Sequence, residues 1–466
     1  MTAPAARPRP ARRALDELSL TVDESTLATV GAGDPDWLVA DRRAAFDAWA
    51  SLPGESNVLY TPYIDLRGAR LEGATVVTGA RIPSATNTGV QTLPDDIAAV
   101  LELTDGVVTA AVLSAQAQSA GITLTDLRSL LASDPERARA FIETGPRLPA
   151  TDKFAQQTRA LWSQGVVLDV PAGVQLDRPI VIRWVTGAAE SAVLTRTLVH
   201  LGDGARVAIV EELVGPVHAR PGPATALGQS FFAGTTEVSL GRDADLTVAS
   251  LQELPAHLVA IQHRVAEIGE GAALHWALAQ LGGRLVRGRV DNRLAGDRSS
   301  VEQVEIVFGN GEQLFDLTSY TTHVGRDTTG NLLSKGALLD GAKTYLKGLI
   351  TIEKSAIGTD SFLGEFGMNL SKAARSVAIP SLEIDQPDCR RAQHASSVGP
   401  IDEAQLFYLE SRGIPPDDAR KFIVLGFLEP VVARVPLASA QDRLRELLEA
   451  KWAAGVATGG EVVAAA

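Results

Sequence analysis

The sequence has only one cysteine, Cys389, among its 466 residues. A disulfide framework is therefore excluded, and so is a zinc–thiolate or iron–sulfur site held by this chain alone, because such sites take about four thiolates. So little cysteine is typical of a reducing compartment, and we expect a cytoplasmic protein.

Basic residues are outnumbered, and long apolar runs are missing. The 43 Lys and Arg residues against 56 Asp and Glu give a formal charge of −13. A general binder of nucleic acid or of anionic membranes would need a basic face, so we expect neither partner. No apolar run approaches the ~18 residues of a membrane span.

Signatures of nucleotide binding and hydrolysis are missing as well. Gly325 to Gly330 has the glycine spacing of a phosphate-binding loop, but Asn331 and Leu332 stand where Lys and Ser/Thr are required. There is no G-x-G-x-x-G, G-x-S-x-G or H-E-x-x-H motif, and no two of the histidines lie four residues apart. We therefore expect that this chain does not bind ATP by itself.

Residues 16–163 predict a mixed, partly helical domain. The expected elements are helices that begin at the N-cap residues of Asp34-Pro35 and Asp134-Pro135, a helix over 151–163, and strands near 75–78 and 107–113. Residues 1–15 are rich in Ala, Pro and Arg and lack the apolar segment of a signal peptide, so we expect a disordered tail.

From 166 to 384 the pattern changes to short runs of Val, Ile, Leu and Thr separated by Gly, Asp and Asn. A weak repeat occurs as Leu201-Gly-Asp-Gly-Ala-Arg-Val207, Leu240-Gly-Arg-Asp-Ala-Asp-Leu246 and Ile268-Gly-Glu-Gly-Ala-Ala-Leu274. Small residues at tight turns suit the stacked coils of a β-solenoid, which lie only ~4.8 Å apart. The alternative is a two-sheet sandwich of hairpins, although Asn-Gly and Asp-Gly turns do not recur at regular spacing.

After residue 400 the sequence becomes helical. Asp402 is expected to cap a helix that ends at Gly413, Pro415-Pro416 to open a second, and Leu437 to Trp452 to form a third. The Gly-rich segment 455–466 is expected to be a flexible tail.

The join between the strand-rich and helical regions carries a distinctive set of residues. It reads Ile379-Pro-Ser-Leu-Glu-Ile384, then His394-Ala-Ser-Ser-Val-Gly399-Pro-Ile-Asp402, then Gln405-Leu-Phe-Tyr-Leu-Glu-Ser-Arg-Gly413. This set resembles the SufB/SufD family of the Suf iron–sulfur cluster assembly system. The resemblance continues upstream in Val170-Pro-Ala-Gly-Val174, Thr318 to His323 and Gly348-Leu-Ile-Thr-Ile352.

The resemblance implies a mainly β fold with a right-handed parallel β-helix over 164–385 and a C-terminal helical domain over 386–454. It also implies a non-enzymatic scaffold in a SufBCD complex, which pairs with SufB through the β-helix and holds the SufC ATPase through the C-terminal helices. A homodimer of the chain alone is a further possibility. The SufB branch is expected to carry a reactive cysteine at a place that corresponds here to Thr359-Asp360. Because the only cysteine lies almost thirty residues further on, the SufD branch is favoured.

His394 corresponds to the family histidine proposed to bind iron or a nascent cluster at the SufB interface. Imidazole is a suitable ligand for ferrous iron, and a weak, shared site suits a cluster that must leave again. No permanently bound cofactor is expected. Many relatives have Cys-Ser just before this histidine, whereas this chain has Ala392-Gln393, and Cys389 is interpreted as an incidental or buried thiol.

The first two C-terminal helices contain more apolar residues than a small hairpin can bury. The resemblance implies that this region binds SufC, and plain packing of the helices on one another is the alternative. The residues expected at the SufC surface are Leu406, Phe407, Tyr408, Leu409, Arg412, Phe422 and Phe427.

Two other functions stay open. A SufB-like scaffold without the reactive cysteine is one, and a β-solenoid enzyme that acts on polysaccharide is the other. The enzyme would need carboxylates clustered on one face. Candidates are plentiful among Asp316, Asp327, Asp340, Asp360 and Glu365, although nothing in the sequence singles them out.

Overall fold

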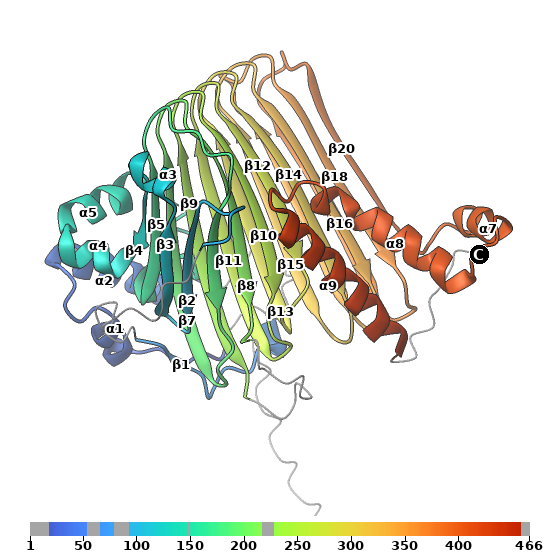
Figure 1. Cartoon of the computed structure of the whole chain (residues 1–466), viewed down its shortest axis with the longest axis horizontal. Coiled ribbons are helices and arrows are strands. Elements are labelled where there is room, and N and C mark those ends of the chain that lie inside the picture. The colour runs from blue at the N-terminus through green and yellow to red at the C-terminus, as the bar shows by residue number, and fades with distance from the viewer. Residues whose placement is uncertain (1–17, 54–65, 79–92, 148, 217–227, 458–466) are drawn as a thin grey trace, which may run out of the picture.

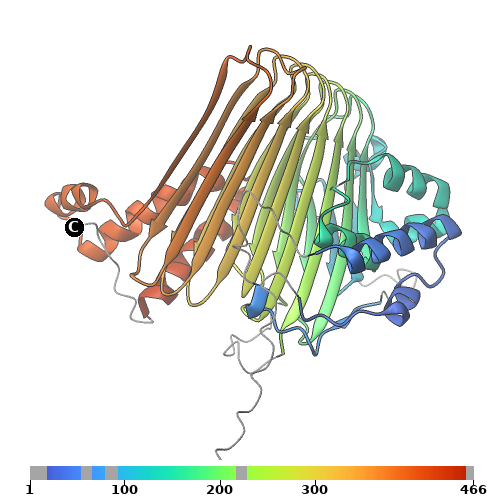
Figure 2. The same cartoon turned by 180° about the vertical axis from the view of Figure 1, so that it is seen from behind.

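The computed structural model describes residues 18–53, 66–78, 93–147, 149–216 and 228–457, which form a long β-solenoid with helices at both ends (Figure 1, Figure 2). The helices are α1 (Glu24–Val30), α2 (Asp36–Ser51), α3 (Ala115–Ser119), α4 (Leu127–Ser133), α5 (Pro135–Thr144), α6 (Lys153–Leu161), α7 (Glu403–Ser411), α8 (Pro416–Val432) and α9 (Ala438–Ala457), with a short 3-10 turn at Leu66–Gly68. The strands are β1 (Thr75–Val76), β2 (Ala99–Thr104), β3 (Val107–Leu113), β4 (Thr123–Asp126), β5 (Gln164–Val170), β6 (Ile180–Val185), β7 (Ser191–Leu201), β8 (Arg206–Val214), β9 (Ser230–Leu240), β10 (Asp245–Glu253), β11 (Leu258–Ile268), β12 (Ala273–Gln280), β13 (Leu285–Leu294), β14 (Ser300–Gly309), β15 (Leu314–His323), β16 (Thr329–Leu338), β17 (Lys343–Ile352), β18 (Asp360–Asn369), β19 (Arg375–Ile384) and β20 (Arg391–Gly399).

From β5 onward, successive strands alternate between two sheets. The first sheet has the order β19-β17-β15-β13-β11-β9-β7-β5-β4, and the second has the order β20-β18-β16-β14-β12-β10-β8-β6-β2-β3. Strands of neighbouring coils pair in parallel; Leu246, for example, lies opposite Val207 on one side and Leu274 on the other. Parallel pairing between coils confirms the predicted solenoid and excludes a sandwich of antiparallel hairpins.

The repeat seen in the sequence forms one column of stacked turns. The N–H of Gly241 donates to the carbonyl of Leu201 at 2.9 Å, and the N–H of Gly269 donates to that of Leu240 at 3.0 Å. A Cβ on Gly269 would lie 2.6 Å from the Leu240 oxygen, so only glycine allows this approach. The small residue of each copy is buried at the start of the next strand, as Ala205, Ala244 and Ala272.

The segment Gly325 to Gly330 belongs to the same column. It connects β15 to β16, and a Cβ on Gly325 would lie 2.3 Å from the carbonyl oxygen of Gly296 in the previous coil. The glycine spacing is therefore explained by coil stacking rather than by phosphate binding.

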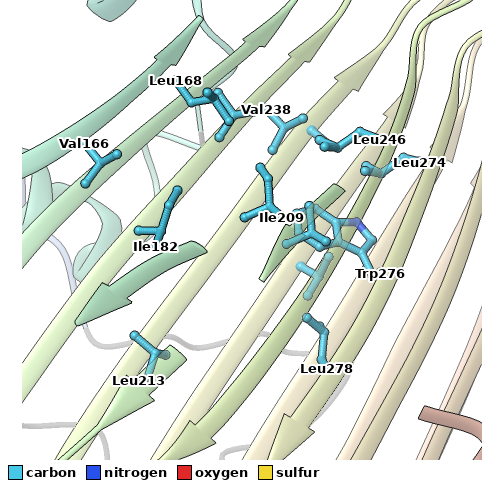
Figure 3. Packing of buried hydrophobic residues seen from close by; sticks show 14 of the residues in the cluster. Val166, Leu168, Ile182, Ile209, Leu213, Val238, Leu246, Leu274, Trp276 and Leu278 are labelled. Carbon is cyan, nitrogen blue, oxygen red and sulfur yellow. The ribbon is translucent and has the colours of Figure 1, made fainter. Parts of the chain in front are cut away.

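Apolar side chains from both sheets fill much of the solenoid interior. Figure 3 shows part of this core, in which Leu168 and Val238 of the first sheet lie near Ile209, Leu246 and Trp276 of the second. Because side chains alternate along a strand, every second residue contributes to this core.

The N-terminal helices cover part of the first sheet's outer face. α6 contacts β7 and β9, and α2 lies against α6. The helices expected from Asp34-Pro35, from Asp134-Pro135 and over 151–163 are present as α2, α5 and α6, but Asp34 does not cap the first of them. Pro35 is the N-cap there, and the Asp34 carboxylate instead binds Arg42 at 2.7 Å and also contacts Arg128.

Strands from residues 75–126 join the two sheets, so the N-terminal region is continuous with the solenoid. β2 adds in parallel to β6 and is followed by β3, whereas β4 pairs with β5 in antiparallel fashion. This arrangement covers the N-terminal end of both sheets.

The C-terminal helices lie on the outer face of the second sheet. α8 contacts β12, β14 and β16, and α9 contacts β14, whereas α7 stands away from the sheets (Figure 1). The expected helical domain over 386–454 is wrong at its start, because β20 is a strand of the second sheet and the first helix begins at Glu403. α9 also extends three residues into the predicted tail at 455–466. The rest of that tail, and the tail at 1–15, lie outside the described residues.

The variant Gly296→Ala tests whether the close spacing of stacked turns depends on glycine. A Cβ at Gly296 would lie 2.1 Å from the backbone nitrogen of Glu270, so a coil must shift, and overpacking of this kind costs about 1–3 kcal/mol of unfolding free energy. Gly426→Ala in α8 is the matched control, because a Cβ there meets nothing within 4 Å. Urea unfolding followed by circular dichroism should show a loss for Gly296→Ala only; equal midpoints would contradict this view of the turns.

Candidate functional site

The last coil of the solenoid, made of β19 and β20, has a neighbouring strand on one side only. β19 pairs with β17 and β20 pairs with β18, and each stands at the end of its sheet. Pro380 lies within β19, which fits an edge strand because proline cannot donate to a ladder. This uncovered coil leaves backbone edges and interior-facing side chains open to a partner.

His394 lies in β20 opposite Leu363 of β18. Leu363 is buried in the solenoid core, and partners in a parallel ladder project to the same face. His394 therefore projects from the interior-facing side of β20, yet it is exposed because no further coil follows.

Within the part of the chain that the structure describes, His394 does not meet enough ligands to hold a metal ion. Among the described residues, no three His, Cys, Asp or Glu side chains lie close enough together to do so. Cys389 is half-buried against the core around Leu363 and Leu382, and an extended chain rising about 3.3 Å per residue separates it from His394.

Cys389 is closer to the Thr359-Asp360 turn than its sequence distance suggests. The N–H of Gly358 donates to the carbonyl of Asp388, and the N–H of Arg390 donates to that of Thr359, both at 2.8 Å. One coil of the solenoid contains about thirty residues, so Cys389 lies only one coil away from Thr359-Asp360. The assumption that thirty residues of sequence place the cysteine far from this position is wrong. The expected position itself still holds no thiol, because Thr359 is a buried turn residue.

Behind the last coil, Glu365 of β18 is fully buried in the interior. Its Oε2 accepts a hydrogen bond from the backbone N–H of Ile379 in β19 at 2.8 Å, and burial raises the pKa of this carboxyl to about 8. Gly348 gives it room, since a Cβ there would lie 3.0 Å from Oε1. His323 lies deeper, between Thr328 and Ser361, and burial lowers its pKa to about 4.

Further polar groups lie inside the middle coils. Arg264 pairs with Glu211 and donates to Ser250 at 2.9 Å, while Gln280 donates to Glu305 at 3.2 Å. Burial raises the pKa of Glu305 to about 7. Sequence reasoning missed these groups, because local sequence patterns do not show which residues of successive coils meet in the interior.

The residues expected at the SufC surface divide by exposure. Phe407 (72%), Tyr408 (57%) and Phe422 (58%) are the most exposed aromatic side chains of α7 and α8, and the Arg412 guanidinium lies 5.4 Å from the centre of the Tyr408 ring. Leu409 and Phe427 are half-buried. Leu406 is only 6% exposed and packs in the core beneath the helices, so its expected place on a binding surface is wrong.

The candidate carboxylates of a polysaccharide-active enzyme are dispersed. Asp327 and Asp340 adopt the positive φ angles of tight turns (55° and 53°), Asp316 pairs with a lysine at 2.6 Å, and Asp360 pairs with an arginine at 2.6 Å. Glu365 is enclosed in the core. Each of these carboxylates is therefore accounted for by a turn, an ion pair or burial in the core. Together they do not form the facing pair of carboxylates that glycoside hydrolysis requires.

Comparison with known proteins places these features in a family. Residues 184–427 match the model of the SUF system FeS cluster assembly SufBD core domain. This range includes most of the solenoid, all of α7 and the first part of α8. The chain belongs to the SufBD family. Among its relatives, the iron–sulfur cluster assembly protein SufD of Bacillus subtilis is 28% identical over 73% of this chain and 76% of its own length. A SufBD family protein of Mycobacterium tuberculosis is 30% identical over 64% of this chain and 74% of its own length.

This SufBD chain is thus SufD-like and related to proteins of iron–sulfur cluster assembly, as the sequence motifs indicate. Within the ranges that the structure describes, no helix is long and apolar enough to cross a membrane.

The buried Glu365 predicts a pH-dependent stability that Glu365→Gln should remove. The folded state binds the proton of this carboxyl more tightly than the unfolded state does, because its pKa is raised to about 8. This contribution to the free energy of unfolding is fully present below about pH 4.5 and is lost as the pH rises toward about 8. The loss is at most ~1.4 kcal/mol per pH unit. Glutamine keeps an acceptor for Ile379 without a charge. We expect the variant to gain stability relative to wild type from pH 5 to 8 in denaturant unfolding.

The control for this prediction is Glu383→Gln at the exposed end of β19. Its stability should follow the wild-type pH curve. If Glu365→Gln follows that curve too, the carboxyl does not titrate in this range.

Proposed function

We propose that this chain is a non-enzymatic SufD-type scaffold, which pairs with a SufB-type subunit and a SufC-type ATPase to assemble and transfer iron–sulfur clusters. The observation that carries the proposal is the uncovered last coil with His394 on it, in a chain of the SufBD family. The dispersed carboxylates favour a scaffold over a hydrolase.

The edges of β19 and β20 support the proposed pairing with SufB. A partner that presents the end of its own solenoid would continue both ladders and cover exposed apolar side chains such as Ile384 and Val398. In the absence of SufB, a second copy of this chain would meet the same edges and give a homodimer.

His394 is proposed to bind iron or a nascent cluster as cargo at this interface. Because too few ligands surround it within the described part of the chain, the remaining ligands would come from the partner. A site divided between two subunits opens when they move apart, which suits a cluster that must be released.

The exposed aromatic side chains of α7 and α8 support the proposed attachment of SufC. Phe407, Tyr408 and Phe422 project from helices that extend beyond the sheet, and aromatic residues commonly dominate binding energy at interfaces. ATP hydrolysis in SufC would move these helices and, through α8 on the second sheet, change the geometry at the last coil.

Replacing His394 with Ala should lower cluster formation several-fold in a reconstituted complex without changing its assembly. The side chain is exposed, and substitutions at exposed positions usually change stability little, so the variant should fold and lose only a ligand. Cluster yield is measured by iron and sulfide content and by absorption. His275→Ala, on the outer face of the second sheet, is the control; equal yields from both variants would refute the role of His394.

Replacing Tyr408 and Phe422 with Asp should release the ATPase partner while SufB binding is kept. Each buried aromatic anchor is worth about 2 kcal/mol or more at an interface, so the double change should weaken binding by about a thousandfold. Co-purification followed by mass detection is the readout. Val39→Asp, an exposed apolar position on α2, is the control, and retention of SufC by the double variant would disprove the assignment.

A further inference from the structure

A cavity of about 230 Å³ lies between the N-terminal helices and the outer face of the first sheet, away from the last coil. α6 and the segment after α5 form its rim, and β7 and β9 form its floor. Its lining residues are Arg147, Ala150, Ala155, Gln156, Thr158, Arg159, Arg196, Thr235 and Glu237. Nothing in the proposed scaffold function uses it.

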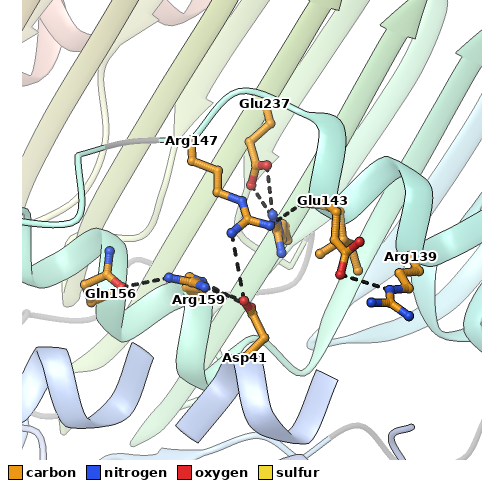
Figure 4. Close-up of polar contacts among 9 residues, drawn as sticks. Asp41, Arg139, Glu143, Arg147, Gln156, Arg159 and Glu237 are labelled. Carbon is orange, nitrogen blue, oxygen red and sulfur yellow. Dashed lines mark hydrogen bonds and ion pairs between the residues drawn. The ribbon is translucent and has the colours of Figure 1, made fainter. Parts of the chain in front are cut away.

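Three guanidinium groups converge on this cavity in a chain with a net charge of −13. Arg147 and Arg159 approach from the rim and meet near Asp41 of α2, as Figure 4 shows. Arg196 lies in the floor beside Glu237. Burial, followed by the charge of Arg159, lowers the pKa of Arg147, so these cations are close enough to repel one another.

Arg196 has a donor with no acceptor in the described structure. It is only 3% exposed, and its Nε and Nη2 donate to the two Glu237 oxygens at 2.6 and 2.9 Å. Its remaining nitrogen, Nη1, is buried without a hydrogen-bond partner among the described residues. A buried guanidinium nitrogen left unpaired is costly. Because Nη1 exposes almost no surface, it does not border the open volume of the cavity, and the Arg196 side chain would have to turn toward a bound anion before this nitrogen could donate to it.

The charges of the lining specify the ligand. Arg147, Arg159 and Arg196 against Glu237 give +3 − 1 = +2, and Asp41 behind Arg159 reduces the local sum to +1. A phosphate group carries about −1.5 to −2 at neutral pH and has several acceptor oxygens. The Thr235 hydroxyl adds a donor to the site, whereas the Thr158 hydroxyl already donates to the carbonyl of Phe154 at 3.1 Å. Ala150 and Ala155 add a small apolar wall.

We propose that this cavity binds a small phosphate-bearing anion, with Arg147 and Arg159 at the rim and Arg196 in the floor. Bidentate and charge-assisted bonds from arginine make such a site selective for oxyanions. The cavity exceeds the volume of one water many times over, so a short organic body fits beside the phosphate. Bound phosphate would connect α6 to β7 and hold the N-terminal helices against the solenoid.

Titration calorimetry of the full chain with inorganic phosphate and with glycerol 3-phosphate, at matched ionic strength, tests the proposal. We expect saturable binding of at least one probe. If glycerol 3-phosphate binds more tightly, the natural ligand is a phosphate monoester. If inorganic phosphate binds equally or more tightly, the natural ligand is the free phosphate ion. Arg147→Gln should weaken binding about tenfold, because it removes a charged donor from the exposed rim. Thr235→Val, which keeps the side-chain shape, should weaken it about fivefold.

The matched control is Arg139→Gln. Arg139 is an exposed arginine nearby, but it pairs with Glu143 at 2.9 Å and does not line the cavity, so its loss changes the net charge equally. We expect its affinity for both probes to stay within about twofold of wild type. No saturable binding of either probe at about 10 mM, or equal weakening by Arg139→Gln and Arg147→Gln, would overturn the proposal.

Discussion

Hydrogen bonding between neighbouring coils is the constraint on which the rest of this molecule depends. Each inner strand of the solenoid satisfies its backbone groups with the coils before and after it, so neighbouring coils must keep the same spacing and register. This requirement explains why glycine recurs where one turn crosses the next, and why a small buried residue follows each turn. It also explains the alternation of the strands between two sheets, since each coil supplies one strand to each.

The same constraint creates the candidate site at the last coil. β19 and β20 are held on one side only, and the interior side chains of that coil, His394 among them, become surface groups without any change in their direction. Glu365 lies one strand behind and binds the Ile379 backbone of the last coil. Residues that would be buried in the middle of a solenoid thus become accessible at its end.

Much of the fold could be predicted from the sequence because its determinants are local. The copies of the turn motif, the capped helices and the Gln405 to Gly413 block each lie within a short stretch of chain. The strand β20 was missed because Arg391 to Gly399 lacks alternating apolar residues; at the end of a solenoid a strand has no second neighbour to pack against. Pro380 in β19 was a usable signal of an edge strand.

The sites were harder to predict because they depend on which residues of different coils meet. Glu365 stood among many equivalent carboxylates in the sequence, and its burial and its hydrogen bond from the Ile379 backbone became visible only in the structure. Cys389 is about thirty residues from Thr359 along the chain yet one coil away in space. Phe407 and Leu406 are adjacent in sequence, but one is exposed and the other buried, because successive residues point in different directions around a helix.

The stacking of coils also allows the solenoid to fold in steps while the chain is being synthesised. Asp360 pairs with Arg391, so a new coil needs only the thirty or so residues most recently added, and a chain leaving the ribosome can fold one coil at a time. At every stage the growing end exposes an edge, and the next coil covers it. Among the residues that the structure describes, the last strand ends at Gly399, and α8 and α9 then lie along the flank of the second sheet instead of covering that edge. A partner strand that bound there, as we propose, would take the place of one further coil.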